Sequence, residues 1–318
     1  MWWSSHGRKA QIRLEPFNIY ILGCGSALPT LRHNASSQVV EMRGKMFMID
    51  CGEGTQTQLR RSKIHFSRVQ RVFISHLHGD HCLGLTGMIS TFGLLGRTAP
   101  LHVYAHGALE AMLRAQMDMF CNGLEYEVLF HAVDTNACQV IYEDHGLAVE
   151  TIPLSHRVPC CGYLFREKMG KRHIRRDMID FYQIPVSQMD NIRSGMDWTT
   201  EEGTVVPNER LTTPPDPPRS YAYCSDTKYM PKLHERLKAV NLLYHEATYG
   251  QECADRARLY NHSTAAQAAT VAKEAQVGKL LLGHFSARYE DEHVLLQEAR
   301  NIFEATELAD EGKVFSVK

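Results

Sequence analysis

The sequence lacks both a membrane-spanning segment and a cysteine pattern that indicates disulfides. No run of roughly 18 or more apolar residues occurs in the chain, so no transmembrane helix is expected. Residues 1–16 lack the apolar core of a secretory signal, and we interpret them as a loose leader. The nine cysteines form no Cys-x-x-Cys pair, a pattern typical of reduced thiols in a cytoplasmic protein.

The chain also lacks a large net charge of either sign. Lys and Arg number 35 and Asp and Glu number 36, which gives a formal charge of −1. This balance excludes a protein that coats nucleic acid non-specifically, although it permits a local basic patch. Histidine is abundant, with 17 residues. A metal enzyme can show such a surplus, but the count alone decides nothing.

The hydrophobic pattern predicts strands followed by helices in each half of the chain. Strands are expected over 17–22, 37–42, 46–49, 71–75, 101–105, 125–131, 139–142, 147–154, 221–225, 241–246 and 279–283, with a last one near Phe315. Helices are expected over 55–61, 83–95, 107–120, 232–239, 264–275 and 291–304. An α/β fold with two packed sheets and helices outside, an αββα sandwich, accommodates this order best.

The segment 166–218 interrupts this pattern. Its periodicity fades, and charged residues, Gly and Pro become frequent. Residues 212–218 read Thr-Thr-Pro-Pro-Asp-Pro-Pro, which is typical of a connector. We therefore expect one domain formed by 1–165 and 219–318, with 166–218 inserted as a flexible arm.

The most informative stretch is the run His-Leu-His-Gly-Asp-His at 76–81, which directly follows a predicted strand. One tetrahedral metal cannot use all four ligand-type side chains and still accept ligands from elsewhere, but two metals can share them. A surface loop that holds these histidines by chance is the weaker alternative. Isolated histidines such as His102, His106 and His131 we interpret as structural.

Three further candidate ligands, His156, Asp226 and His284, each lie just beyond a predicted strand, where loops at one sheet edge can meet. The expected dinuclear site holds one metal with His76, His78 and His156, and the other with Asp80, His81 and His284, while Asp226 bridges them. Imidazole and carboxylate ligands favour Zn²⁺, with Mn²⁺ or Fe as alternatives.

Two metal ions about 3.5–4 Å apart activate a water near neutral pH and neutralise charge on a phosphoryl oxygen. Asp80 can both bind a metal and accept the proton of that water. The same arrangement suits hydrolysis of a phosphodiester, a lactam or a thioester, so the ligands alone do not identify the substrate.

The run at 76–81 resembles the signature of the metallo-β-lactamase superfamily, and four further motifs resemble the short form of its ribonuclease Z family. They are Gly-Cys-Gly-Ser-Ala-Leu-Pro (23–29), Asp-Cys-Gly-Glu-Gly-Thr-Gln (50–56), His-Glu-Ala-Thr (245–248) with Tyr-Asn-His-Ser-Thr (260–264), and His-Phe-Ser-Ala-Arg-Tyr (284–289). The motifs at 245–264 and 284–289 are the more specific. Generic members of the superfamily do not have His-Glu-Ala-Thr and His-Ser-Thr together. The similarity runs from about Asn18 to the C-terminus.

The resemblance implies a zinc-dependent endoribonuclease that removes the 3′ trailer from precursor tRNA. It would cut after the discriminator nucleotide, leave a 3′-hydroxyl and bind two Zn²⁺ per subunit through the same seven ligands. His262 matches the family's proposed general acid, and Glu246 its supporting partner. The alternative for His262 is a residue at a helix start, capped by Ser263 or Thr264.

The resemblance further implies a homodimer in which the arm of one subunit holds tRNA at the active site of the other. Residues 166–176 set six Lys and Arg against one Glu, which is typical of a phosphate-binding patch, with a merely solvated loop as the alternative. The candidate RNA-binding residues are Lys168, Lys171, Arg172, Arg175 and Arg176. Two stretches depart from the family pattern, 191–198 at the expected arm tip and 66–69 before the histidine motif.

Two other functions fit parts of the pattern. A small-molecule phosphodiesterase or arylsulfatase of the same superfamily would share the metal site but leave the basic segment and His262 unexplained. A non-catalytic RNA-binding or scaffold protein on this fold is expected to have lost ligands, whereas every candidate ligand is present here.

Overall fold

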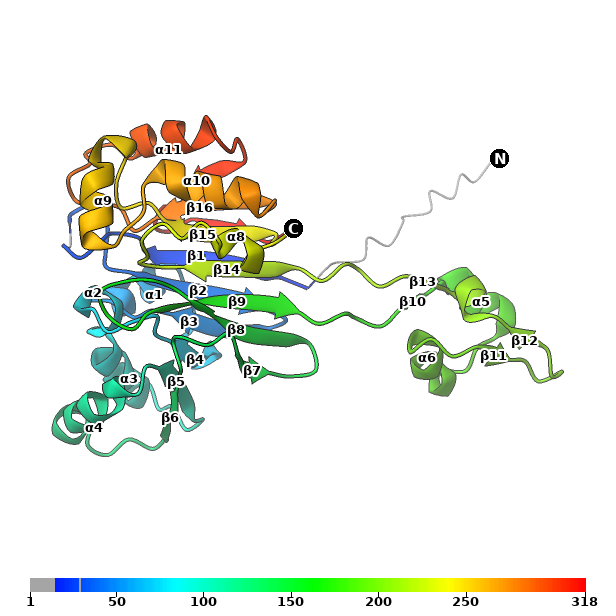
Figure 1. Cartoon of the computed structure of the whole chain (residues 1–318). Coiled ribbons are helices and arrows are strands. Elements are labelled where there is room, and N and C mark those ends of the chain that lie inside the picture. Colours follow the sequence, from blue (N-terminus) through cyan, green and yellow to red (C-terminus); the bar gives the residue numbers. More distant parts are fainter. Residues whose placement is uncertain (1–14, 29) are drawn as a thin grey trace, which may run out of the picture.

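The computed structural model of the chain describes residues 15–28 and 30–318. Two seven-stranded β-sheets pack face to face with helices on their outer faces, and a slender arm projects from one end of this body (Figure 1). The αββα sandwich is thus confirmed. The expected leader, apart from its last two residues, lies outside the described residues. No described helix is long and apolar enough to cross a membrane.

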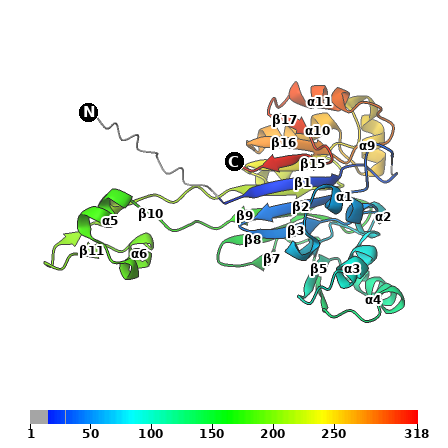
Figure 2. The same cartoon turned by 180° about the vertical axis from the view of Figure 1, so that it is seen from behind.

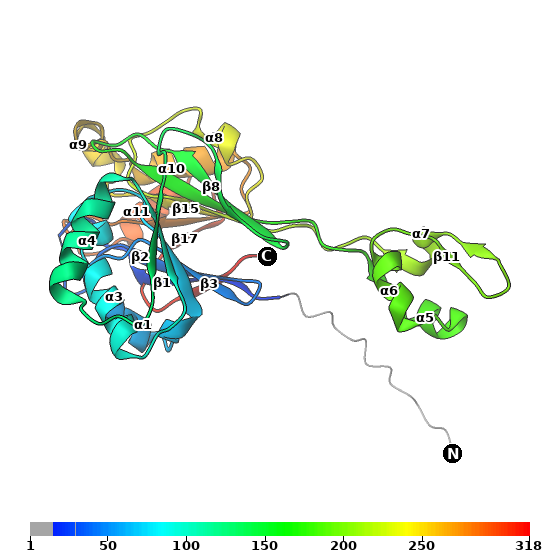
Figure 3. The same cartoon turned by 90° about the horizontal axis from the view of Figure 1, so that it is seen from below.

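The first sheet has the strand order β18-β1-β2-β3-β4-β5-β6. Its strands are β1 (Phe17–Gly23), β2 (Ser37–Met42), β3 (Lys45–Ile49), β4 (Val69–Phe73), β5 (Leu101–Ala105), β6 (Val128–Ala132) and β18 (Val314–Ser316). Helices α1 (Thr55–Arg61), α3 (Leu85–Leu94) and α4 (Ala108–Phe120) pack on its outer face, as seen from below in Figure 3. Because β3 to β6 are parallel, the loops that follow them open at the same end.

The second sheet has the order β17-β16-β15-β14-β9-β8-β7. Its strands are β7 (Val140–Glu143), β8 (Leu147–Pro153), β9 (Cys161–Glu167), β14 (Ser220–Cys224), β15 (Leu242–Glu246), β16 (Lys279–Gly283) and β17 (Thr306–Leu308). Helices α8 (Leu233–Arg236), α9 (Ala254–Tyr260), α10 (Ala265–Glu274) and α11 (His293–Arg300) lie on the side of this sheet (Figure 1), and α9, α10 and α11 are seen from behind in Figure 2. A capping box between Thr264 and Gln267 starts α10, whose buried alanines allow close packing on the sheet.

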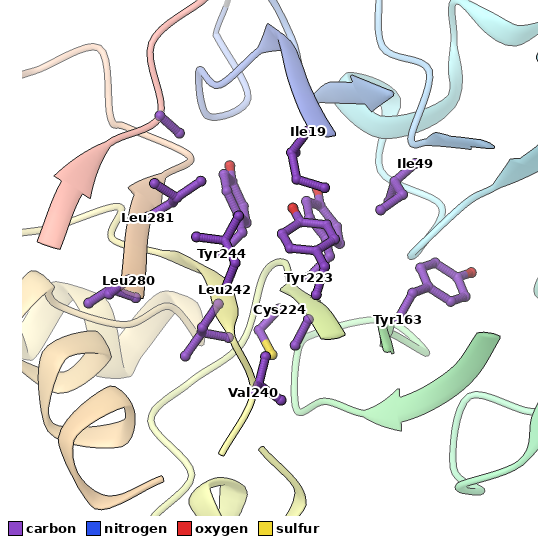
Figure 4. Close-up of a cluster of buried hydrophobic side chains, with 14 of the residues drawn as sticks. Ile19, Ile49, Tyr163, Tyr223, Cys224, Val240, Leu242, Tyr244, Leu280 and Leu281 are labelled. Carbon is purple, nitrogen blue, oxygen red and sulfur yellow. The ribbon is translucent and has the colours of Figure 1, made fainter. Parts of the chain in front are cut away.

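Aromatic side chains fill the space between the sheets. The rings of Tyr223 and Tyr244 stack with centroids 4.9 Å apart, and both are fully buried in the cluster of Figure 4. The hydroxyl of Tyr223 donates a hydrogen bond of 2.7 Å to Oδ2 of Asp50. The core therefore reaches a carboxylate at the end of β3, next to the histidine motif.

Several elements differ from the sequence predictions. The helix expected over 232–239 is only the short α8, since Leu237 and Val240 turn into the core and Ala239 adopts a φ of +56°. The helix α9 and the strands β9 and β17 were not predicted. Six of the seven residues of β9 are buried, so β9 lacks the apolar-polar alternation that identifies a strand.

The arm leaves the body at the end of β9 and returns at the start of β14, two antiparallel neighbours. Its elements are β10 (His173–Ile174), α5 (Arg176–Tyr182), α6 (Val186–Arg193), β11 (Trp198–Thr199), β12 (Val205–Val206), α7 (Asn208–Leu211) and β13 (Thr212–Thr213). A small core of Ile184, Ile192, Val206 and Leu211 holds them together. The outer part of the segment is therefore folded, although its sequence shows little periodicity.

Candidate metal centre

The seven predicted ligands meet at the end of the sandwich opposite the arm, beside α2 (Gly79–Cys82) in Figure 1. They follow β4, β8, β14 and β16. Strands β14 and β16 run in the same direction, and β8 does too, because β9 is antiparallel to both β8 and β14. The C-terminal ends of these strands therefore open onto one edge, as the sequence argument expected.

In the first metal position, imidazole nitrogens converge on one oxygen of Asp226. Nε2 of His76 lies 3.0 Å and Nε2 of His156 lies 3.3 Å from Nδ1 of His78. Oδ2 of Asp226 lies 3.6 Å from Nε2 of His76 and 3.7 Å from Nε2 of His156. These separations lie within a few tenths of an ångström of the edges of a tetrahedral ligand set, about 3.3–3.6 Å for metal–ligand distances near 2.0–2.2 Å.

The second position uses the other oxygen of the same carboxylate. Oδ1 of Asp226 lies 3.1 Å from Nε2 of His284 and 3.5 Å from Nε2 of His81. Oδ2 of Asp80 lies 3.3 Å from Nε2 of His81 and 3.5 Å from Nε2 of His284. Asp226 thus presents one oxygen to each position, which is the geometry of a bridging ligand.

The donor atoms fit metal ions. Nε2 of His81 and Nε2 of His284 are buried and have no hydrogen-bond partner in the described part of the chain. A buried nitrogen without a partner is costly unless a cation accepts its lone pair. Burial also lowers the pKa of His76, His78 and His156, which keeps these imidazoles in the neutral form that binds metals.

The opposite ring nitrogens are held by a second layer of contacts. Nδ1 of His76 lies 3.0 Å from Oγ of Ser75, and Nδ1 of His81 lies 2.8 Å from Oδ2 of Asp50. His156 bonds the carbonyl of Asn261 at 2.9 Å through the same atom. Such partners fix the tautomer and aim Nε2 at the metal.

The remaining histidine contact involves Thr248, whose Oγ1 lies 2.9 Å from Nδ1 of His284. The sequence interpretation did not identify Thr248 or Asp50 as site residues. Both lie in motifs that it singled out, 245–248 and 50–56. Asp50 and His284 each follow a strand with φ of +55° and +58°, a left-handed conformation that non-glycine residues rarely keep without a local reason.

His262 stands at the edge of this centre and is held by Glu246. Its Nδ1 lies 2.9 Å from Oε1 of Glu246, and its ring lies 5.0 Å from that of His156. Burial disfavours the charged imidazole, but the Glu246 carboxylate outweighs it and raises the pKa of His262 to about 9. Because Glu246 occupies Nδ1, Nε2 is the atom available to the adjacent cavity.

A cavity of about 380 Å³ opens over the centre. It is lined by His262, by ligands of both metal positions, and by Arg157, Tyr249 and Tyr260, which the sequence interpretation did not single out. The guanidinium of Arg157 lies 4.8 Å from the ring centroid of Tyr260. The wall thus combines a cation and aromatic faces with the metal ligands.

The candidate RNA-binding residues lie apart from this centre, on and beside the arm, and most have partners. Lys168 pairs with Glu143 at 2.7 Å, and Lys171 pairs with Asp190 at 2.6 Å. Contacts within the arm also engage Arg172 with Thr212 and Arg175 with Asp177, each at 2.7 Å. The full segment 166–218 carries eight Lys and Arg against nine Asp and Glu, so the basic patch is confined to its base.

The isolated histidines also lie outside the centre. Nδ1 of His102 lies 2.9 Å from Nε2 of His131, and the two rings stack on neighbouring strands. His106 contacts the backbone of Ala108 at the start of α4. None of the three belongs to the groups of candidate ligands found in the described residues.

Solved structures with a similar fold identify the fold of this chain. Human tRNase Z, short form, superposes with a TM-score of 0.68 and 24% identity, covering 95% of this chain and 99% of that one. The metallo-β-lactamase fold protein YhfI from Bacillus subtilis superposes with a TM-score of 0.66 and 18% identity, covering 95% and 100%. The chain therefore has the metallo-β-lactamase fold, with a candidate metal centre at one end of its two sheets.

Sequence relatives narrow this fold class. Proteins named Ribonuclease Z from Bacteroides fragilis and Phocaeicola vulgatus are each 56% identical to the chain over 96% of its length, and the alignments cover 100% and 99% of those proteins. A family model described as anti-Pycsar protein Apyc1 also matches residues 17–175. The chain belongs to the ribonuclease Z family.

Proposed function

We propose that the chain is a zinc-dependent endoribonuclease that removes the 3′ trailer from precursor tRNA, cutting after the discriminator nucleotide and leaving a 3′-hydroxyl. The observation that carries this proposal is the position of His262, which Glu246 holds beside a candidate two-metal ligand set. The names of the curated relatives, and of the human protein with a similar fold, support this substrate.

The proposed cofactor is a pair of Zn²⁺ ions, with Mn²⁺ or Fe as the alternatives for the same donors. His76, His78, His156 and Asp226 would hold one ion, and Asp80, His81, His284 and Asp226 the other. When bound, such a pair activates water and stabilises charge on a phosphoryl oxygen.

Asp80 is the proposed proton acceptor on the attacking side. Its Oδ2 faces the second metal position and accepts a 2.8 Å hydrogen bond from the backbone N–H of Ala27. Burial works against ionisation, but His81 and His284 outweigh it and keep the pKa of Asp80 well below its usual value. The carboxylate therefore stays charged, and its Oδ1 makes no hydrogen bond in the described residues.

His262 is the proposed general acid, and Glu246 its positioning residue. Oε1 of Glu246 accepts the Thr227 N–H at 2.8 Å and holds His262 at 2.9 Å, while Oε2 faces Thr248. A carboxylate with this many partners is fixed in place and keeps the imidazole oriented. A protonated His262 can then deliver its Nε2 proton to the leaving oxygen.

The arm is the proposed tRNA-binding exosite. Where the arm joins the body, a cavity of about 220 Å³ is lined by the positively charged Lys168, Lys171 and Arg193, among other residues. The exposed ion pairs there are weak because solvent screens them, so RNA phosphates can replace the acidic partners. The folded tip suits recognition of tRNA shape rather than sequence.

We further propose a homodimer and a cytoplasmic location. The arm and the candidate metal centre of one chain lie at opposite ends of the sheets (Figure 1). A tRNA held by the arm of one chain is therefore better placed for cleavage at the metal centre of a second copy. Large apolar side chains are exposed on and beside α3 and α4; they are Leu94, Leu95, Met112, Met119 and Phe120. Such a patch favours a protein contact, and nine free cysteines favour a reducing compartment.

The function is tested by incubating the protein with a precursor tRNA that carries a 3′ trailer, and separately with bis-p-nitrophenyl phosphate. We expect one cut after the discriminator nucleotide, mapped at nucleotide resolution, and loss of that cut in Asp80→Ala. Hydrolysis of the small ester without any cleavage of the tRNA would instead favour the small-molecule phosphodiesterase.

A further inference from the structure

A second group of metal-ligand side chains lies outside the dinuclear centre. It combines Cys24 after β1, His33 in the following loop and Glu311 before β18, and their donor atoms lie within 4.8 Å of one another. Sγ of Cys24 lies 3.3 Å from Nδ1 of His33, and Oε1 of Glu311 lies 3.7 Å from the same nitrogen. The loop between β1 and β2 and the segment before β18 thus bring a thiol, an imidazole and a carboxylate together.

The separations suit a single ion. Tetrahedral Zn²⁺ with Zn–S near 2.3 Å and Zn–N or Zn–O near 2.0–2.2 Å places its ligand atoms about 3.3–3.6 Å apart. The two measured separations that involve His33 fall within a few tenths of an ångström of this range. Small side-chain rotations are therefore sufficient to close the triangle around a metal.

Neighbouring groups already orient two of the three donors. Nε2 of His33 lies 3.3 Å from Oε1 of Glu292, which aims Nδ1 at Cys24 and Glu311. The backbone and side-chain amides of Asn34 both donate to the Glu311 carboxylate. A carboxylate behind a metal-binding histidine is the usual outer contact of a protein zinc site.

The negative charge of the carboxylates in this cluster also favours binding of a cation. Glu292 has an ion-pair partner in Arg32 at 2.9 Å, whereas Glu311 in the described part of the chain accepts from the neutral amides of Asn34 and Gln58 and contacts the ring of His33. Burial, and then the nearby carboxylates of Glu311, Asp310 and Glu292, raise the pKa of the Cys24 thiol. The cluster can gain its missing positive charge in two ways, as a proton on His33 or as a metal ion.

We propose that Cys24, His33 and Glu311 bind a zinc ion that is separate from the dinuclear centre. A thiolate, an imidazole and a carboxylate select Zn²⁺ over Mg²⁺ or Ca²⁺. Cys24 binds as the thiolate, and its proton is released to solvent when the metal enters. The fourth ligand is water, because the histidine and glutamate side chains are 11% and 13% exposed.

The ion would hold a segment that borders the dinuclear centre. Residues 26–28, which lie between Cys24 and His33, line the active-site cavity, and the Ala27 N–H donates to Asp80. Ser26 donates its N–H to the carbonyl of Phe285, next to His284, at 3.0 Å. The site therefore has a structural role, fixing the loop that meets both Asp80 and the His284 segment.

Cobalt substitution of the full-length protein tests this proposal directly. The ligands of the dinuclear centre are His and Asp only, so a thiolate-to-cobalt charge-transfer band in the near ultraviolet reports on Cys24 alone. We expect this band in the Co²⁺-loaded protein, its loss in Cys24→Ser, and one fewer equivalent of bound metal in that variant.

Two further variants make the result decisive. Cys82→Ser is the matched control, because Cys82 is buried beside the 76–81 motif and must leave the band unchanged. His33→Gln keeps Cys24 in place and should also lose the band and one equivalent, with circular dichroism reporting the fold. Absence of the band in wild-type protein at saturating Co²⁺ would overturn the proposal. The positive charge of the cluster would then come from a proton on His33. Cleavage of precursor tRNA is measured separately, so failure of the nuclease proposal leaves this test intact.

Discussion

Replacing Thr248 with valine should weaken metal binding without removing the general acid. The Thr248 hydroxyl bridges Nδ1 of His284 at 2.9 Å and Oε2 of Glu246 at 2.6 Å. Valine has nearly the same shape but no hydroxyl, so a buried ring nitrogen of His284 loses its partner. Glu246 keeps its contacts to Thr227 and His262, so His262, the proposed proton donor, stays in position.

The expected magnitude follows from the kind of contact that is lost. Removing an outer partner of a metal-binding histidine typically weakens metal affinity about 10–100-fold, which corresponds to about 1.4–2.7 kcal/mol. Leaving a buried nitrogen unsatisfied costs a similar amount, about 1–3 kcal/mol. We therefore expect the apparent Kd for zinc to rise 10–100-fold, while kcat on precursor tRNA recovers at saturating zinc.

The assay is a competition for zinc against a chromophoric chelator, combined with cleavage rates over a zinc titration. Thr248→Ser is the matched control, because serine keeps the hydroxyl and should keep near wild-type affinity. Wild-type zinc affinity in Thr248→Val, or equal weakening in both variants, would refute the role of the hydroxyl.

Three other predictions concern catalysis, the arm and pH. His262→Ala should slow cleavage roughly 10²–10⁴-fold while bound metal, measured by mass spectrometry, is unchanged; cleavage at the normal rate would exclude it as general acid. Replacing 169–217 with a short glycine linker preserves the Glu167–Arg219 ion pair at the base of the arm. We expect this variant to process tRNA poorly but to hydrolyse bis-p-nitrophenyl phosphate normally. Loss of both activities would show that the arm is part of the catalytic body. Burial opposes ionisation of Glu167, but hydrogen bonds from Arg219 outweigh it and lower the Glu167 pKa. That stabilisation is present above the ordinary Glu pKa of 4.5 and is lost as pH falls through the lowered value. Denaturant unfolding should therefore show a smaller loss of stability on acidification in Glu167→Gln, and an unchanged pH dependence would contradict this assignment.

Much of the fold and the metal centre followed from local patterns. The motif at 76–81 carries four candidate ligands within six residues, so its metal-binding chemistry is predictable without any tertiary information. His156, Asp226 and His284 were found because each follows a strand-like run, and a sheet gathers the ends of such runs at one edge. The αββα order needed only the grouping of strands before helices in each half.

Other features depend on contacts between residues far apart in the chain. The strand β9 is buried on both faces and gains its identity from pairing with β8 and β14. Thr248 and Asp50 gain their roles only because folding places their oxygens against His284 and His81. Side-chain identity alone does not predict which ring nitrogen such an oxygen meets.

The available chemistry can be predicted from the amino-acid order alone, because candidate metal ligands and strand periodicity are properties of neighbouring residues. The distribution of charges in space depends on the folded chain. Folding divided the two oxygens of Asp226 between two positions and paired Lys171 with Asp190. It also joined Cys24, His33 and Glu311. Electrostatic interactions depend on distance in space, and the chain order does not contain these distances until the sheets have packed.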